Sequence, residues 1–189
     1  MQNFIANYRI NYLLIGFFIF NMALGESLPA NESPTPEMQD EFIAFTPPEG
    51  WKLVDAKSLS PSVKAMVIGK GEHEFPPSIN LATEPYARSL NDYLKKVKEV
   101  NQADGADWKS LGSIQTQAGE GNLSQVDLAT QWGDVRMMHV ILLKNNTIYI
   151  LTASALKSEF PKFYKDFFTS LQSLRFSKNV ENKENKNEK

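Results

Sequence analysis

The chain has 189 residues, of which 42% are hydrophobic and 22% charged, a composition typical of one globular domain with a buried core. Its formal net charge of −2 excludes the strongly basic balance that favours nucleic-acid binding. It contains no cysteine, which excludes disulfides, thiolate metal ligands, thiol nucleophiles and a lipid-anchored cysteine.

The first 25 residues have the pattern of a secretory signal peptide. Arg9 precedes the short apolar run Leu13–Phe20, and small residues at Ala23 and Gly25 mark a cleavage position. The apolar run is shorter than the roughly 20 residues that a transmembrane helix requires. We therefore expect a signal peptide over residues 1–25 and an exported, periplasmic or secreted protein. The alternative is an uncleaved N-terminal anchor, and we expect membrane contact only in that case.

Two segments near the ends of the chain have compositions that do not support a packed core. Residues 26–40 carry three prolines and four acidic residues without a basic one, which predicts a flexible linker. Residues 178–189 alternate Lys, Glu and Asn, which predicts a disordered charged tail. The stretch between them, residues 41–177, has the length of one domain.

The first half of this predicted domain contains a tight turn and two short strands. Pro48 fixes the backbone and Gly50 tolerates conformations that other residues avoid, so they predict a turn. We expect Trp51, directly after it, to anchor the turn in the core. Val63–Gly69 and Ser78–Glu84 are typical of short strands, and Lys70–Pro77 between them is predicted to be a loop.

A helix is predicted to begin after Ser89. Ser89 and Asp92 form the S-x-x-D pattern that caps a helix N-terminus. Apolar side chains then recur at helical spacing, and Gly105 is expected to end the element. The apolar positions are Leu90, Tyr93, Leu94 and Val97.

Residues 108–154 predict a meander of four strands. The expected turns lie at 118–121, at 133–134 and at 144–146, where Gly or Asn residues cluster. Residues 125–132 alternate polar and apolar side chains, so this strand is expected to have one wet face and to lie nearer the sheet edge. The two runs within Val135–Ser154 are apolar on both faces, which predicts central strands covered by helices on both sides.

A second helix is predicted from Glu159, with Ser158 as its N-cap and Pro161 in its first turn. Its apolar residues form a broad stripe, which we expect to pack on the sheet. A ligand-binding aromatic box is the alternative. The stripe consists of Phe160, Phe163, Tyr164, Phe167, Phe168, Leu171 and Leu174.

Only two histidines are available as a base or as metal ligands. His139 shares a strand face with Met137 and Ile141, so a neutral, hydrogen-bonded core histidine is expected. His73 lies in Glu72-His73-Glu74, where neighbouring side chains on an extended loop diverge, so a metal site would need ligands from elsewhere. The sequence has no G-x-S-x-G motif and no acidic pair that we can place across a cleft. We predict no catalytic, cofactor-binding or metal-binding residue and no cofactor.

Three short stretches resemble the PsbP-like family, which includes photosystem II proteins, a Ran-binding import factor and DcrB-type bacterial envelope proteins. The stretches are Phe45–Trp51, Ser78–Leu81 leading to Ser89–Tyr93, and Tyr149–Ala155 followed by the aromatic helix. The resemblance covers roughly residues 42–176 and implies an α/β/α sandwich, an α+β fold, around a mainly antiparallel sheet of about six to seven strands. The matched positions are turn, cap and core residues, so the resemblance transfers no site residue.

These observations lead to a functional expectation without a chemical signature. The export signal and the lack of a nucleophile, base or metal cluster favour a non-enzymatic factor that binds a protein partner in assembly or maintenance of the cell envelope. The alternative is a small-molecule or divalent-metal-binding protein that uses the loop Lys70–Pro77. A hydrolase has the least support.

Overall fold

A computed structural model describes residues 41–178 of the chain. The predicted signal peptide, the predicted linker and all but the first residue of the predicted tail lie outside the described residues, so these assignments remain predictions. Within 41–178, neither α-helix combines the length and apolar character needed to span a bilayer.

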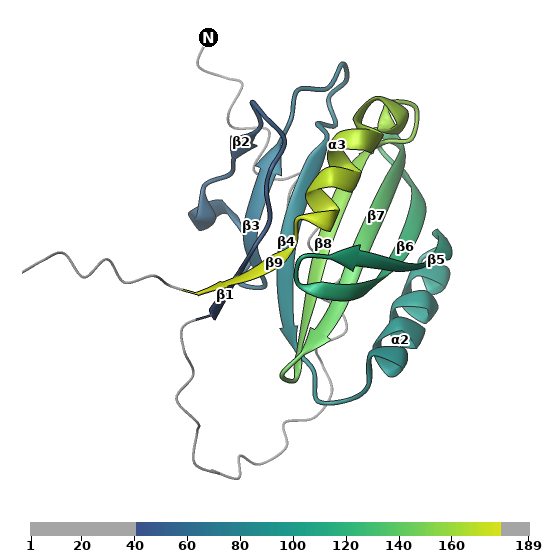
Figure 1. Cartoon of the computed structure of the whole chain (residues 1–189). Helices are drawn as coiled ribbons and strands as arrows, with labels where there is room; N and C mark the ends of the chain where they lie inside the picture. The colour runs from purple at the N-terminus through teal and green to yellow at the C-terminus, as the bar shows by residue number, and fades with distance from the viewer. Residues whose placement is uncertain (1–40, 179–189) are drawn as a thin grey trace, which may run out of the picture.

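The centre of the molecule is a seven-stranded antiparallel sheet with the strand order β2-β3-β4-β8-β7-β6-β5 (Figure 1). This confirms the fold class and strand number predicted from the sequence. The strands are β2 (Lys52–Leu53), β3 (Val63–Ile68), β4 (Ser78–Pro85), β5 (Asp107–Thr116), β6 (Gly119–Thr130), β7 (Gly133–Lys144) and β8 (Thr147–Leu156). A short 3₁₀ helix, η1 (Ala56–Ser58), connects β2 to β3.

Strands β7 and β8 lie in the middle of the sheet, as their two apolar faces predict. On one face Met138, Val140 and Leu151 join a core cluster with residues of helix α3 (Phe160–Gln172). On the other face Ile141 and Ile150 pack with residues of helix α2 (Leu90–Ala103). Alternation of side chains along the strands thus divides the core into an α3 face and an α2 face.

Helix α2 begins where the sequence predicts. The Ser89 hydroxyl accepts a hydrogen bond from the backbone N–H of Asp92 at 3.2 Å, which satisfies one of the free N–H groups of the first turn. Tyr93 is the buried anchor of the helix, and its hydroxyl donates to Glu84 at 2.9 Å. The helix ends at Ala103, and Gly105 follows with a positive φ of 75°.

Helix α3 begins one residue later than the sequence predicts. Its N-cap is Glu159 instead of Ser158, and no side chain caps its first turn. Glu159 is held elsewhere, because its carboxylate accepts a hydrogen bond from the backbone N–H of Glu72 at 2.8 Å. Trp51 packs edge-on against Phe163 and Phe167 of α3. This contact confirms Trp51 as the anchor of the Pro48–Trp51 turn.

A second, two-stranded sheet covers part of the α3 face. Strands β1 (Glu41–Ala44) and β9 (Arg175–Lys178) pair antiparallel. Phe176 of β9 packs edge-on against Tyr149 of β8, with ring centroids 5.1 Å apart. The groove described below lies on the same face, between α3 and residues of β5, β6 and β7.

Two polar pairs cross between neighbouring strands inside the α2 face. The hydroxyls of Ser78 and Ser154 lie 2.8 Å apart between β4 and β8, and both residues are buried. His139 Nδ1 and Thr152 Oγ1 lie 2.9 Å apart between β7 and β8. The strand register places the members of each pair directly opposite each other.

Candidate functional site

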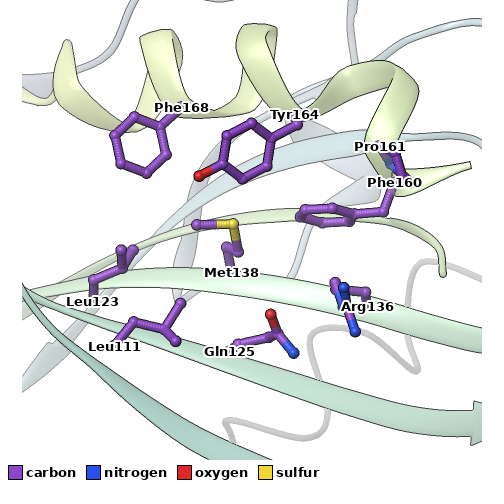
Figure 2. Close-up of a pocket in the computed structure, with 9 residues that line it drawn as sticks. All are labelled: Leu111, Leu123, Gln125, Arg136, Met138, Phe160, Pro161, Tyr164 and Phe168. Carbon is purple, nitrogen blue, oxygen red and sulfur yellow. The ribbon is translucent and has the colours of Figure 1, made fainter.

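A groove of about 560 Å³ lies between α3 and the strands β5, β6 and β7. Figure 2 shows the helix residues on one wall, the strand residues opposite them and open space between the two sets. The volume is within the range of ligand sites in proteins, and the lining is mostly apolar, as such sites require. The lining residues are Leu111, Leu123, Gln125, Arg136, Met138, Phe160, Pro161, Tyr164 and Phe168.

A bulge in the edge strand β5 provides the outermost residue of the groove. The pairing of β5 with β6 passes from Ser110 to Gly112 and skips Leu111, and Gly112 has a φ of 92° that disfavours other residues. The extra residue of a β-bulge is unpaired in the ladder and its side chain is re-aimed. Leu111 consequently lines the groove with 46% of its surface exposed.

The opposite wall is one side of the aromatic stripe of α3. Phe160, Phe167 and Leu171 are buried in the core, as the stripe predicts. Tyr164 is instead 50% exposed, and its ring stacks on Phe168 with centroids 5.6 Å apart. The expectation that the whole stripe packs on the sheet is therefore wrong at Tyr164, because this side of the stripe faces the open groove.

One end of the groove is charged and centred on Asp127 of β6. Arg136 of β7 donates two hydrogen bonds to its carboxylate, from Nε at 2.8 Å and from Nη2 at 2.7 Å. Lys157 Nζ lies 2.9 Å from Oδ2, and Gln125 Nε2 donates to Oδ1 at 3.3 Å. The sequence predicts that this face of β6 is exposed to solvent. At Asp127 the face is instead buried, because these partners cover the carboxylate.

These contacts fix the protonation state of Asp127. The hydrogen bonds from Arg136, followed by those from Lys157, together lower its pKa to about 2, against the opposing effect of burial. The carboxylate is therefore ionised at neutral pH and is not a proton donor. The Arg136 guanidinium also lies 5.9 Å from the centre of the Phe160 ring, so it links the charged end to the apolar lining.

His139 is a core residue, as the sequence predicts. It is buried on the α2 face, opposite the groove, and burial lowers its pKa to about 4. At neutral pH it is the uncharged partner of Thr152. Ser124, directly opposite it on β6, is also buried, and its hydroxyl has no partner among the described residues.

The structure brings a distant carboxylate to the loop that contains His73. His73 Nδ1 lies 3.3 Å from Glu159 Oε1, while Glu72 forms an ion pair with Lys162 at 2.7 Å. Glu159 is 1% exposed, and its Oε2 atom has no hydrogen-bond partner among the described residues. Within 41–178 no three His, Asp or Glu side chains converge to hold a metal ion, so the metal-binding alternative lacks a ligand set there.

The groove was not predicted from the sequence, although several of its residues were noted there as core or stripe positions. Its walls come from segments about 50 residues apart along the chain, and no local sequence pattern encodes their approach. The available local signal is Gly112, because a glycine within a strand pattern indicates a bulge.

Comparison with known proteins supports the fold. No protein-family model matches the sequence, and no curated protein matches it either. The solved structure of LpqN from Mycobacterium tuberculosis, a protein involved in cell envelope biogenesis, is similar with a TM-score of 0.52 and 11% identity over 75% of this chain and 86% of LpqN. At this identity the similarity shows a shared fold.

Two further structures give lower scores. Cyanobacterial PsbP from Synechocystis sp. PCC 6803 has a TM-score of 0.46 and 15% identity over 78% of this chain and 98% of its own. The Ran-binding protein Mog1p of Saccharomyces cerevisiae has a TM-score of 0.48 and 16% identity over 71% of this chain and 89% of Mog1p. The antiparallel α+β fold that the resemblance in the sequence motifs implies is confirmed, and this chain shares it with LpqN.

Proposed function

We propose that this protein is an exported, non-enzymatic factor that binds a protein partner in the cell envelope and contributes to assembly or maintenance there. The groove between α3 and β5–β7 is the surface that we assign to this partner. It is the observation that carries the proposal, because it combines an apolar lining with a charged end and with exposed side chains on both walls.

The geometry of the groove supports binding in preference to catalysis. The buried carboxylate at its charged end, Asp127, is paired with Arg136 and Lys157 and is protonated only below about pH 2. The histidine of the sheet, His139, lies on the opposite face. The groove thus offers surface for contact, and the described residues around it place no base beside a nucleophile.

Two independent observations support an envelope location. The first 25 residues have the composition of a signal peptide. The fold is shared with LpqN, whose role is in cell envelope biogenesis. These observations support a search for the partner in the cell envelope.

Site-specific photo-crosslinking in intact cells of the source organism tests the proposal. A benzophenone amino acid at Tyr164 is expected to yield one dominant protein adduct in the exported fraction, because this ring is half exposed on the groove wall. The matched control carries the same group at Leu53, which is 74% exposed on β2 at the opposite edge of the sheet.

The controls test export, the groove as the binding site and the protein partner separately. Recovery of the protein in the cytoplasmic fraction would contradict export. Equal adducts from Tyr164 and Leu53 would show nonspecific contact and remove the groove as the site. Absence of any adduct from Tyr164 would count against a protein partner.

A further inference from the structure

We propose that the groove recognises an extended peptide segment with a large apolar side chain and an acidic side chain four residues away from it. This inference rests on the function proposed above and specifies the chemistry of the partner. It follows from the arrangement of apolar and charged groups along the groove, from their separation, and from the free edge of β5.

The apolar and charged groups lie at opposite ends of the groove. Figure 2 shows Leu111 and Leu123 beneath Phe168 at one end and Arg136 beneath Phe160 at the other. A large apolar side chain of a partner would cover the exposed surface of Leu111 and Tyr164, which is the main source of favourable free energy in such a site.

The charged end presents cations to solvent. Asp127 is buried, whereas Lys157 and Lys109 keep about half of their side chains exposed and Arg136 about a quarter. Lys109 is paired with the exposed Asp107, so the five groups together carry one excess positive charge. An anionic side chain of the partner complements this end.

The spacing along β6 sets the spacing in the partner. Leu123 and Asp127 mark the two ends on the same face of β6 and are four residues apart, which corresponds to about 13 Å in an extended chain. An extended peptide bound alongside β6 has the same spacing when its apolar and acidic residues are also four positions apart. Both side chains then point to the same side, since residues at even separations along an extended chain share a face.

The open edge of the sheet favours a peptide over an amphiphile. β5 pairs only with β6 in the described sheet, and its bulge leaves the main chain at Leu111 outside the ladder. A peptide can form main-chain hydrogen bonds there, as in recognition by strand addition. An alkyl chain has no main-chain donors or acceptors and cannot form these bonds.

Fluorescence anisotropy with the full chain and short labelled peptides tests the inference. The probes are Ser/Thr-rich peptides with Phe and Glu four positions apart, in both orders. The comparison peptides have Lys in place of Glu, Ser in place of Phe, or Glu moved by one position to the opposite face. We expect the Phe–Glu probe in one of its orders to bind at least about tenfold more tightly than each comparison peptide.

Variants of the protein locate the binding. Leu111→Asp is expected to weaken binding of the Phe–Glu probe by at least about tenfold, while Leu53→Asp at the opposite edge leaves it unchanged. Lys157→Gln is expected to reduce the preference for Glu over Lys, and Arg136 still holds Asp127 in this variant. Urea unfolding of each variant confirms that it is folded.

Several results would overturn the inference. Binding that ignores peptide sequence, or no binding up to the solubility limit, removes the extended peptide. Leu111-dependent binding of dodecanoate without peptide binding assigns the groove to an amphiphile. A dimer in sedimentation equilibrium that Leu111→Asp abolishes assigns it to a second copy of the chain. A Tyr164 crosslink to a protein, together with no peptide binding, preserves the proposed function and rejects only this partner class.

Discussion

Asp127 shows how one residue connects the fold to the charged end of the groove. Its carboxylate has three donors from β6, β7 and the segment after β8, namely Gln125, Arg136 and Lys157. Arg136 binds both oxygens, a geometry that holds the guanidinium against the Phe160 ring. Removing the carboxylate would leave the two cations beside the apolar lining without the anion that pairs with both of them.

The depressed pKa of Asp127 predicts an acid-dependent stability. The folded-state pKa of about 2 is below the ordinary value of 3.8, so the unfolded chain binds this proton first as the pH falls. The stabilising contribution is present above the unfolded-state pKa and is lost as the pH falls through about 2. Its size is about 2 kcal/mol from the pKa difference. Asp127→Asn is therefore expected to lower the free energy of unfolding by about that amount at neutral pH.

Urea unfolding followed by tryptophan fluorescence between pH 7 and pH 2 measures this effect. The difference between the wild type and Asp127→Asn is expected to close toward pH 2. Asp107→Asn is the matched control, because Asp107 is exposed and its ion pair with Lys109 contributes at most about 1 kcal/mol. A difference for Asp127→Asn that stays constant across this pH range would contradict the assignment.

The two helices differ in how they begin, although the sequence offers a serine cap for both. Ser89 caps α2 through its hydroxyl, and its side chain also donates to the Asp92 carboxylate at 2.7 Å. Ser158 is exposed and lies outside α3, whose N-cap Glu159 is directed toward the 70–77 loop. A cap pattern predicts that a helix begins nearby, but tertiary contacts decide which residue occupies the position.

This difference gives a matched pair of substitutions. Ser89→Ala is expected to lower the free energy of unfolding by about 1 kcal/mol, because the N–H of Asp92 loses its acceptor. Ser158→Ala is expected to change it by less than about 0.5 kcal/mol, as at other exposed positions. Chemical denaturation of the two variants under one set of conditions measures both values. Equal losses would show that Ser158 also caps α3 in solution.

The sequence predicted the elements well and the groove not at all. The central strands follow from two apolar faces in residues 135–154, and the Asn145-Asn146 turn follows from residues that tolerate positive φ, observed at 50° and 56°. The contact of Glu159 with Glu72 joins residues 87 positions apart, and no local pattern encodes such a pairing. Likewise, Leu111 lies in a bulge of β5, and the direction of its side chain is determined by the pairing of β5 with β6.

At the scale of the whole molecule, the two faces of the sheet have different cover. The α2 face is closed by its helix over Ile141, Ile148 and Ile150. The α3 face is shared among the helix, the small β1–β9 sheet and the groove. The apolar groove therefore lies beside the edge strand β5, at the opposite edge of the sheet from β2.

The pairing of the first and last described strands leads to a prediction for the whole molecule. Both end strands, β1 and β9, pair with each other, so a chain of residues 41–178 retains every described strand pairing. We expect it to unfold in one cooperative transition, with a urea midpoint equal to that of the full chain within error. Circular dichroism during urea titration of both chains tests this. A clearly lower midpoint for the shorter chain would show that residues outside 41–178 stabilise the domain.

The buried polar pairs on the α2 face have a consequence for the specificity of strand pairing. Because β7 and β8 are apolar on both sides, a hairpin shifted by one residue would still bury hydrophobic groups, so hydrophobicity alone selects its alignment weakly. Any shift separates His139 from Thr152 and leaves an imidazole nitrogen desolvated without a partner, and a shift of β8 against β4 does the same to Ser78 and Ser154. Misaligned pairings of the most hydrophobic strands, β7 and β8, are therefore destabilised. The native alignment is selected by a few polar atoms that contribute little to the overall stability of the chain.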